Sequence, residues 1–175
     1  MTKIVTIEDK RDEKFLRAAT VPFDIKKLKD ASAAKEIRAL IKQMREIMNR
    51  ANGVGLSANQ IGIRERFFVA QMPTNQGAQK FYAIFNPEII KKSKEIDGAE
   101  EGCLSIPEIY GNIKRHYEII LSGYDLRGKK IKIKAWGFLA RVFQHEVDHL
   151  DGKLFMDAAT DLRKINQSDQ HPEII

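Results

Sequence analysis

The alternation of apolar and polar residues along the chain predicts two helices. Apolar residues recur at steps of three and four between positions 37 and 51, which predicts an amphipathic helix over about residues 30–52. Gly53 follows this stretch, where a left-handed C-cap would end the helix. A second set of apolar residues predicts a later helix over about residues 137–152.

Shorter apolar runs predict strands. Residues 66–71 (RFFVAQ) and 81–85 (FYAIF) are rich in aromatic and β-branched residues and are separated by a polar loop. Residues 117–124 and 129–134 flank the turn sequence DLRG, which indicates a hairpin. In the last of these strands isoleucine alternates with lysine, so we expect one buried face and one charged face.

The rest of the chain indicates how these elements are organised. Residues 158–175 are expected to form a short helix and then a loose tail. Repeats, low-complexity tracts and interdomain linkers are not evident, so the sequence predicts one compact α+β domain over residues 1–175. We expect small antiparallel or mixed sheets to pack around the later helix, with the long amphipathic helix near the N-terminus.

Composition and charge narrow the class of protein. Hydrophobic residues at 43% and charged residues at 31% are typical of a globular chain and argue against wholesale disorder. Cys103 is the one cysteine, which excludes an intramolecular disulfide and favours a reducing compartment. No signal sequence or membrane span is evident, so we expect a cytoplasmic protein without a membrane partner. The net charge of +6 can attract RNA or another polyanion, but no RNA-binding signature of a dedicated nucleic-acid module accompanies it.

The strongest candidate chemistry lies on the later helix. His145 and His149 are four positions apart, and Glu146 follows the first of them, which is the HExxH pattern of a divalent metal site with an adjacent carboxylate base. A catalytic zinc-type centre usually takes three protein ligands and one water, so a third ligand is needed. The other histidines, His116 and His171, have no ligand-like spacing and are expected at the surface.

Three positions are candidates for the third ligand. The metzincin pattern places a histidine where this chain has Phe155, which cannot bind a metal. Thermolysin-like enzymes use a later glutamate, but after His149 the chain offers only Glu173, in the predicted loose tail. Cys103 remains, in the sequence EGCLSIP, and its thiolate is a strong donor to divalent ions. A set of Cys103, His145 and His149 leaves one coordination position open for chemistry.

Three segments together resemble the peptide deformylase family. They are GVGLSANQIG at 53–62, EGCLS at 101–105 and QHEVDH at 144–149, in the order and at the approximate separation of that family's signatures. The resemblance covers roughly residues 35–157. Ser57 stands where the family usually has alanine, and Asn59 occupies a variable position.

The resemblance implies a reaction and a set of residues. The reaction is removal of the formyl group from the N-terminal formylmethionine of newly made polypeptides, with water on the metal as the nucleophile. It implies that Glu146 is the general base and that the side-chain amide of Gln60 and the backbone N–H of Leu104 stabilise the oxyanion. It also implies ferrous iron as the native metal, although zinc, nickel or cobalt would suit the same ligands.

The resemblance also suggests substrate contacts. Gly53 and Gly55 would allow close approach of a peptide backbone. Val54, Phe138 and Val142 are candidates for an apolar methionine pocket, and Arg115 is expected to orient Asp148. The expected partners are formyl-Met nascent peptides, with transient ribosome association through the basic surface and with neither DNA nor membrane.

Two other interpretations remain open from the sequence. The first is a zinc endopeptidase of another HExxH class, although no suitable histidine or glutamate ligand follows the helix. The second is a basic RNA- or ribosome-associated protein with a structural metal site, which would need four protein ligands.

Overall fold

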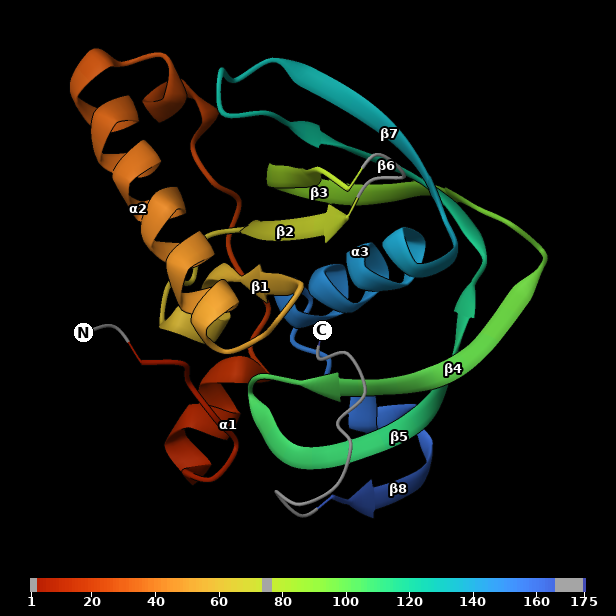
Figure 1. Ribbon diagram of the computed structural model, residues 1–175. Helices are drawn as coiled ribbons and strands as arrows, with labels where there is room; N and C mark the ends of the chain where they lie inside the picture. The colour runs from red at the N-terminus through yellow and green to blue at the C-terminus, as the bar shows by residue number, and fades with distance from the viewer. Residues whose placement is uncertain (1–2, 74–76, 166–174) are drawn as a thin grey trace.

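Two antiparallel sheets enclose the helix that carries the HExxH sequence (Figure 1). The computed structural model describes residues 3–73, 77–165 and 175. The helical elements of these residues are α1 (Lys10–Leu16), η1 (Ile25–Leu28), α2 (Ala31–Arg50), η2 (Ala58–Ile61), α3 (Gly137–Leu150) and η3 (Phe155–Asp157). The strands are β1 (Gly55–Ser57), β2 (Phe67–Pro73), β3 (Gln79–Lys92), β4 (Ile96–Cys103), β5 (Ile106–His116), β6 (Glu118–Tyr124), β7 (Lys130–Trp136) and β8 (Thr160–Lys164).

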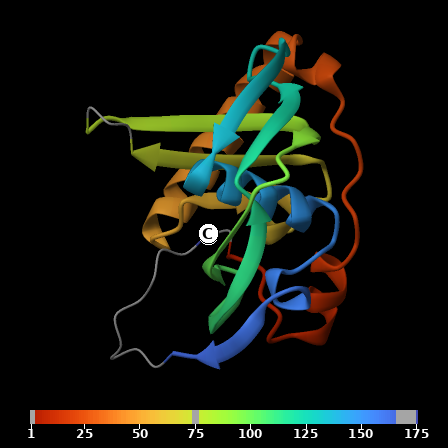
Figure 2. The same cartoon turned by 90° about the vertical axis from the view of Figure 1, so that its right-hand side faces the viewer.

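The larger sheet has five strands in the order β1-β2-β3-β6-β7, with every neighbouring pair antiparallel. It lies between two helices (Figure 2). Phe67 and Val69 of β2 belong to the apolar cluster that includes the buried face of α2, whereas Phe68 and Ala70 belong to the cluster around α3. Because successive residues of a strand point to opposite faces, β2 is buried on both sides. This explains the apolar run of its first four residues, Phe67 to Ala70.

The smaller sheet has the order β4-β5-β8 and is also antiparallel. Strands β4 and β5 are long and paired along most of their length, and they are joined by a tight connection at Leu104 and Ser105. The sheet lies on the other side of α3 from the larger one (Figure 1). This topology brings Cys103, the last residue of β4, to the buried side of α3.

Helix α2 confirms the predicted amphipathic helix, with a correction at its end. Asp30 caps its N-terminus, where the side chain accepts a hydrogen bond of 2.8 Å from the backbone N–H of Ala33. At the C-terminus the left-handed residue is Asn52, with φ of 56°, and not Gly53 as predicted. Asparagine tolerates this conformation because its short side chain can hydrogen-bond locally.

Helix α3 confirms the later predicted helix and is buried almost all round. Its polar residues Arg141, Gln144, His145, Glu146 and His149 are as inaccessible as its apolar ones. A helix enclosed on several sides is normally apolar, and buried polar groups have to find partners. The buried polar groups of α3 therefore indicate a functional site along this helix.

The α+β fold class and the predicted hairpin of β6 and β7 are confirmed, and the outer face of β7 carries the expected lysines. The predicted short helix after residue 157 is wrong, because residues 160–164 form strand β8 against β5. Most of the predicted loose tail, residues 166–174, lies outside the described residues, whereas Ile175 is buried. Among the described residues, no helix is both long and apolar enough to cross a membrane.

Candidate metal centre

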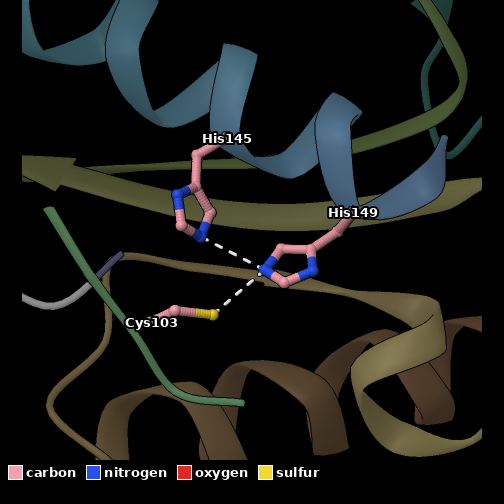
Figure 3. Close-up of side chains that lie close together, drawn as sticks. All are labelled: Cys103, His145 and His149. Carbon is pink, nitrogen blue, oxygen red and sulfur yellow. Dashed lines mark hydrogen bonds between the residues drawn. The ribbon is translucent and has the colours of Figure 1, made fainter. Parts of the chain in front are cut away.

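Three donor side chains meet beside α3. Cys103 comes from the end of β4, and His145 and His149 lie one turn apart on the helix (Figure 3). The Nε2 atom of His149 is 3.1 Å from the Sγ atom of Cys103 and 3.2 Å from the Nε2 atom of His145. All three side chains are buried, with exposed fractions of 3%, 1% and 1%. The structure therefore brings together the three residues that the sequence proposed as ligands.

The chemistry of this donor set fits a divalent transition metal. The three donor atoms lie within 4.8 Å of one another, and within the described ranges no further Cys, His, Asp or Glu joins the group. One thiolate and two imidazoles suit zinc or ferrous iron, and three protein ligands leave a fourth position for water or substrate. Burial and the neighbouring His145 hold the pKa of His149 well below its usual value, so this imidazole is neutral and can donate a lone pair.

Glu101 orients His145 from behind. Its Oε2 atom lies 2.9 Å from Nδ1 of His145, which leaves Nε2 directed at Cys103 and His149. Burial lowers the pKa of His145, but its contacts with Cys103 and Glu101 outweigh this and raise it to about 10. A cation binds the unprotonated nitrogen, so cation binding is expected to release a proton.

Two arginines neutralise Glu101. The Nε and Nη2 atoms of Arg115 each donate a hydrogen bond of 2.8 Å to the carboxylate, and Nη1 of Arg141 donates one of 2.9 Å. Burial alone raises the pKa of Glu101, but the hydrogen bonds from Arg115 and His145 hold it well below its usual range. Arg115 also contacts Asp148, as expected from the resemblance.

Glu146 lies at the centre of the site with no exposed surface. Burial raises its pKa to about 7, against the opposing effects of His145 and of a hydrogen bond from Ser57. A carboxylate of this kind can both accept and return a proton near neutral pH. Its Oε1 atom has no hydrogen-bond partner among the described residues, and the backbone of Gly55 is so close that a Cβ there would lie 2.1 Å from Oε1.

Gln60 faces the sulfur of Cys103. Its Oε1 atom accepts a hydrogen bond of 2.7 Å from the backbone N–H of Ser57, which turns the Nε2 atom toward the Sγ atom of Cys103, at 3.7 Å, and the Oγ atom of Ser105, at 3.2 Å. Leu104 directly follows Cys103, and its side chain packs so closely against Gly53 that a Cβ there would lie 2.7 Å from it. Gly53 therefore leaves space for the side chain of Leu104, as Gly55 does for the carboxylate of Glu146.

The proposed pocket residues share one apolar cluster. Val142 is fully buried in it, and Val54 and Phe138 pack against it while partly exposed. Ile175 belongs to the same cluster, and its backbone N–H donates a hydrogen bond of 3.3 Å to the carbonyl of Gly102. The cluster thus accommodates the apolar side chain of Ile175, whose backbone is hydrogen-bonded to Gly102, the residue before Cys103.

Sequence reasoning missed several residues of the site. Ser57 was interpreted only as a departure from the family pattern, and Glu101 and Arg141 were given no role. Asn59 donates a hydrogen bond of 2.6 Å from Nδ2 to the carbonyl of His149, which ties the segment before Gln60 to α3. A signal for Glu101 was present, since an acidic residue lies in the same motif as Cys103. The other three required knowledge of which elements meet.

The two histidines expected at the surface differ in outcome. His116 is partly exposed, its Nδ1 atom lies 2.7 Å from the carbonyl oxygen of Ser93, and it is not a member of the metal-ligand group. His171 lies outside the described residues.

A buried HExxH helix with a third donor from a neighbouring strand and a carboxylate beside the histidines defines a metallohydrolase-type site. The sequence profile of the polypeptide deformylase family matches residues 1–165. The chain belongs to the polypeptide deformylase family.

Individual relatives agree with this membership. The chain is 47% identical to a peptide deformylase of Endomicrobium trichonymphae over 141 residues, which covers 78% of this chain and 82% of the relative. It is 42% identical to that of Symbiobacterium thermophilum over 137 residues, which covers 78% of this chain and 62% of the relative. A class I type b peptide deformylase from Acinetobacter baumannii, solved with Met-Ala-Ser bound, superposes with a TM-score of 0.78 at 28% identity and covers 90% of this chain and 99% of that one.

Proposed function

We propose that this protein hydrolyses the formyl group from the N-terminal formylmethionine of newly made polypeptides and releases formate. The observation that carries the proposal is the buried set of Cys103, His145 and His149 with Glu146 beside it, in a chain of the polypeptide deformylase family. Such a site contains a ligand set with one open position and a proton acceptor, which amide hydrolysis requires.

The ligands and the base have separate tasks. A divalent ion held by Cys103, His145 and His149 would act as a Lewis acid and lower the pKa of water at its open position. Glu146 accepts the proton of the attacking water and passes it to the leaving amine. Its pKa of about 7 suits both transfers, because proton acceptance and donation are then nearly balanced at neutral pH.

Gln60 and Leu104 are proposed to stabilise the oxyanion that forms at the formyl carbon. The contact with Ser57 turns the amide N–H groups of Gln60 toward Cys103, so they are in place before the charge develops. Leu104 directly follows Cys103 in sequence, and its backbone N–H is the second proposed donor. Both donors are neutral N–H groups, so they can stabilise the oxyanion without binding the cation as a carboxylate would.

The substrate is proposed to bind beside Gly102, at the end of β4 next to Cys103, with its methionine side chain among Val54, Phe138 and Val142. The support is Ile175, whose buried side chain lies in this cluster while its N–H bonds to the carbonyl of Gly102. A peptide can add to a sheet edge through such backbone hydrogen bonds while a pocket selects its side chain. Met-Ala-Ser, bound to the Acinetobacter baumannii enzyme, is a peptide of the matching kind.

Ferrous iron is the proposed native metal, and zinc, nickel or cobalt would fit the same donors. We propose that the protein works in the cytoplasm, where nascent chains emerge. The lysines on the outer face of β7 are proposed to support transient contact with the ribosome, because a basic surface is attracted to RNA.

The test compares three substrates. Protein loaded with ferrous iron without oxygen is given formyl-Met-Ala-Ser, acetyl-Met-Ala-Ser or denatured casein, and formate and new amino termini are measured. We expect formate from the formyl peptide alone. Glu146→Ala should keep its metal and lose at least roughly 100-fold in kcat. Cleavage of casein without formate release would replace the proposal with an endopeptidase.

A further inference from the structure

We propose that Ser57 is a positioning residue whose hydroxyl holds Oε2 of Glu146, so that Oε1 is the oxygen that receives the proton of the attacking water. The proposal rests on the proposed function. It is carried by one contact: the Oγ atom of Ser57 lies 2.6 Å from Oε2 of Glu146. That distance is in the range of a charge-assisted O–H···O⁻ hydrogen bond, which is about twice as strong as a neutral one.

The hydroxyl has two acceptors within reach but one proton to donate. The backbone carbonyl of Glu146 lies 3.0 Å from Oγ, and the carboxylate oxygen Oε2 lies 2.6 Å away. The hydroxyl therefore donates its hydrogen bond to the nearer and charged acceptor, Oε2. Ser57 therefore keeps its own hydrogen throughout, and the proton taken from water goes to Oε1 and from there to the leaving amine.

The backbone of β1 makes this donor rigid. Ser57 is fully buried and pairs with Phe68 of β2, and its backbone N–H is held by the Oε1 atom of Gln60 at 2.7 Å. The side chain that fixes Glu146 and the N–H that orients Gln60 thus belong to one residue. Strand β1 thus orients both the carboxylate of Glu146 and the side-chain amide of Gln60.

The second oxygen of the carboxylate is confined but free of partners. Oε1 is buried and accepts no hydrogen bond from the described residues. Gly55 lies against it, since a Cβ at that position would be 2.1 Å away. With Ser57 on one oxygen and the backbone of β1 close to the other, the carboxylate has little room to rotate. Oε1 is left as the acceptor for the substrate water.

This arrangement depends on the hydroxyl of Ser57. An alanine at this position would fill nearly the same volume and would have no donor. Ser57→Ala is therefore expected to fold while it removes only the hydrogen bond. Ser57→Thr keeps the hydroxyl in a strand, where a β-branched residue is tolerated.

The experiment measures kcat and KM for formyl-Met-Ala-Ser, metal content and thermal unfolding. The proteins are the wild type, both Ser57 variants, and Glu146→Gln with and without Ser57→Ala. Ser122→Ala serves as a matched control, because Ser122 is a buried serine on β6 outside the site. We expect Ser57→Ala to lower kcat about tenfold or more at an unchanged KM and metal content. Ser57→Thr should recover most of the rate, and Ser122→Ala should match the wild type.

The double variant separates a positioning role from a structural one. If Ser57 acts through Glu146, Ser57→Ala causes no further loss in the Glu146→Gln background. A wild-type kcat in Ser57→Ala, an equal loss in the alanine and threonine variants, or the same fold-loss in the Glu146→Gln background would overturn the role of Ser57. Absence of formate release by the iron-loaded wild type would instead refute the proposed function.

Discussion

Replacement of Gly55 by alanine tests how closely β1 sets the position of Glu146, the proposed general base. The added Cβ would lie 2.1 Å from Oε1 of Glu146 and 2.8 Å from its Cδ atom. Ordinary van der Waals contact begins at 3.4 Å, so Oε1 has to retreat from 2.1 to at least 3.4 Å, about 1.3 Å. A misplacement of roughly 1 Å in a reacting group costs on the order of 100-fold in rate. We therefore expect kcat to fall about 100-fold.

Stability should fall less markedly than activity. Overpacking a buried site costs about 1–3 kcal/mol, and each kcal/mol lowers the unfolding temperature of a domain of this size by roughly 2–4 °C. The metal ligands come from β4 and α3, so metal content should stay near that of the wild type. A variant that unfolds early or loses its metal would show that the rate loss has another origin.

The assay is steady-state release of formate from formyl-Met-Ala-Ser, with metal analysis and thermal unfolding of the same samples. Gly98→Ala is the matched control, because Gly98 is also in a strand and a Cβ there meets nothing within 4 Å. We expect this control to keep the wild-type kcat. A Gly55→Ala enzyme with unchanged kcat, or with Glu146 unmoved in its crystal structure, would refute the reasoning.

Three further outcomes follow from the same contacts. Cys103→Ala should lose most of its bound metal on elemental analysis, and unchanged stoichiometry would exclude the thiolate as a ligand. The pKa of the Glu101 carboxylate is lowered in the folded protein. The ionised carboxylate therefore stabilises the fold above the pKa of an unfolded glutamate, about 4.3, and this stabilisation is lost as pH falls below that value. Glu101→Gln should flatten the dependence of unfolding temperature on pH in that range. Ile175→Gly should lower KM for formyl-Met-Ala-Ser by up to about tenfold at similar kcat, because the buried side chain would no longer compete for the pocket; an unchanged KM would contradict this.

The elements that could be predicted from sequence are those whose signal is local. Helix α2 shows its apolar stripe in its own residues, and the β6–β7 hairpin shows its turn and its alternation of isoleucine with lysine. The end of α2 differs from the prediction by one residue, because Asn52 and not Gly53 takes the left-handed position. Asparagine and glycine both accept that conformation, so adjacent residues of these types cannot be distinguished by propensity alone.

Other elements are strands only because of their partners. Strand β4 contains two glycines and three acidic residues, a composition unfavourable for a strand, yet it pairs with β5 over nearly its whole length. Strand β8 is exposed throughout, so no alternation of burial marked it, and its pairing with β5 fixes it. Short helix α1 was likewise not predicted.

The site shows the same division between local and distant information. Its three motifs pointed to the proposed donors, the proposed base and the amide of Gln60 because each motif is continuous in sequence. The contacts that orient them join residues far apart: Ser57 and Glu146 are separated by 89 positions, and Glu101 and Arg141 by 40. Without the fold, neither pair could be recognised.

The division of the site between elements implies that metal binding and proton transfer can be separated by mutation. The donors Cys103, His145 and His149 are fixed by β4, α3 and the carboxylate of Glu101 behind them. Glu146 and Gln60 are instead held by β1, through Ser57 and the close approach of Gly55. Changes in β1 should therefore yield proteins that bind metal and turn over slowly. Changes at Cys103 or Glu101 should weaken metal binding first, and the rate should fall in proportion to the metal lost.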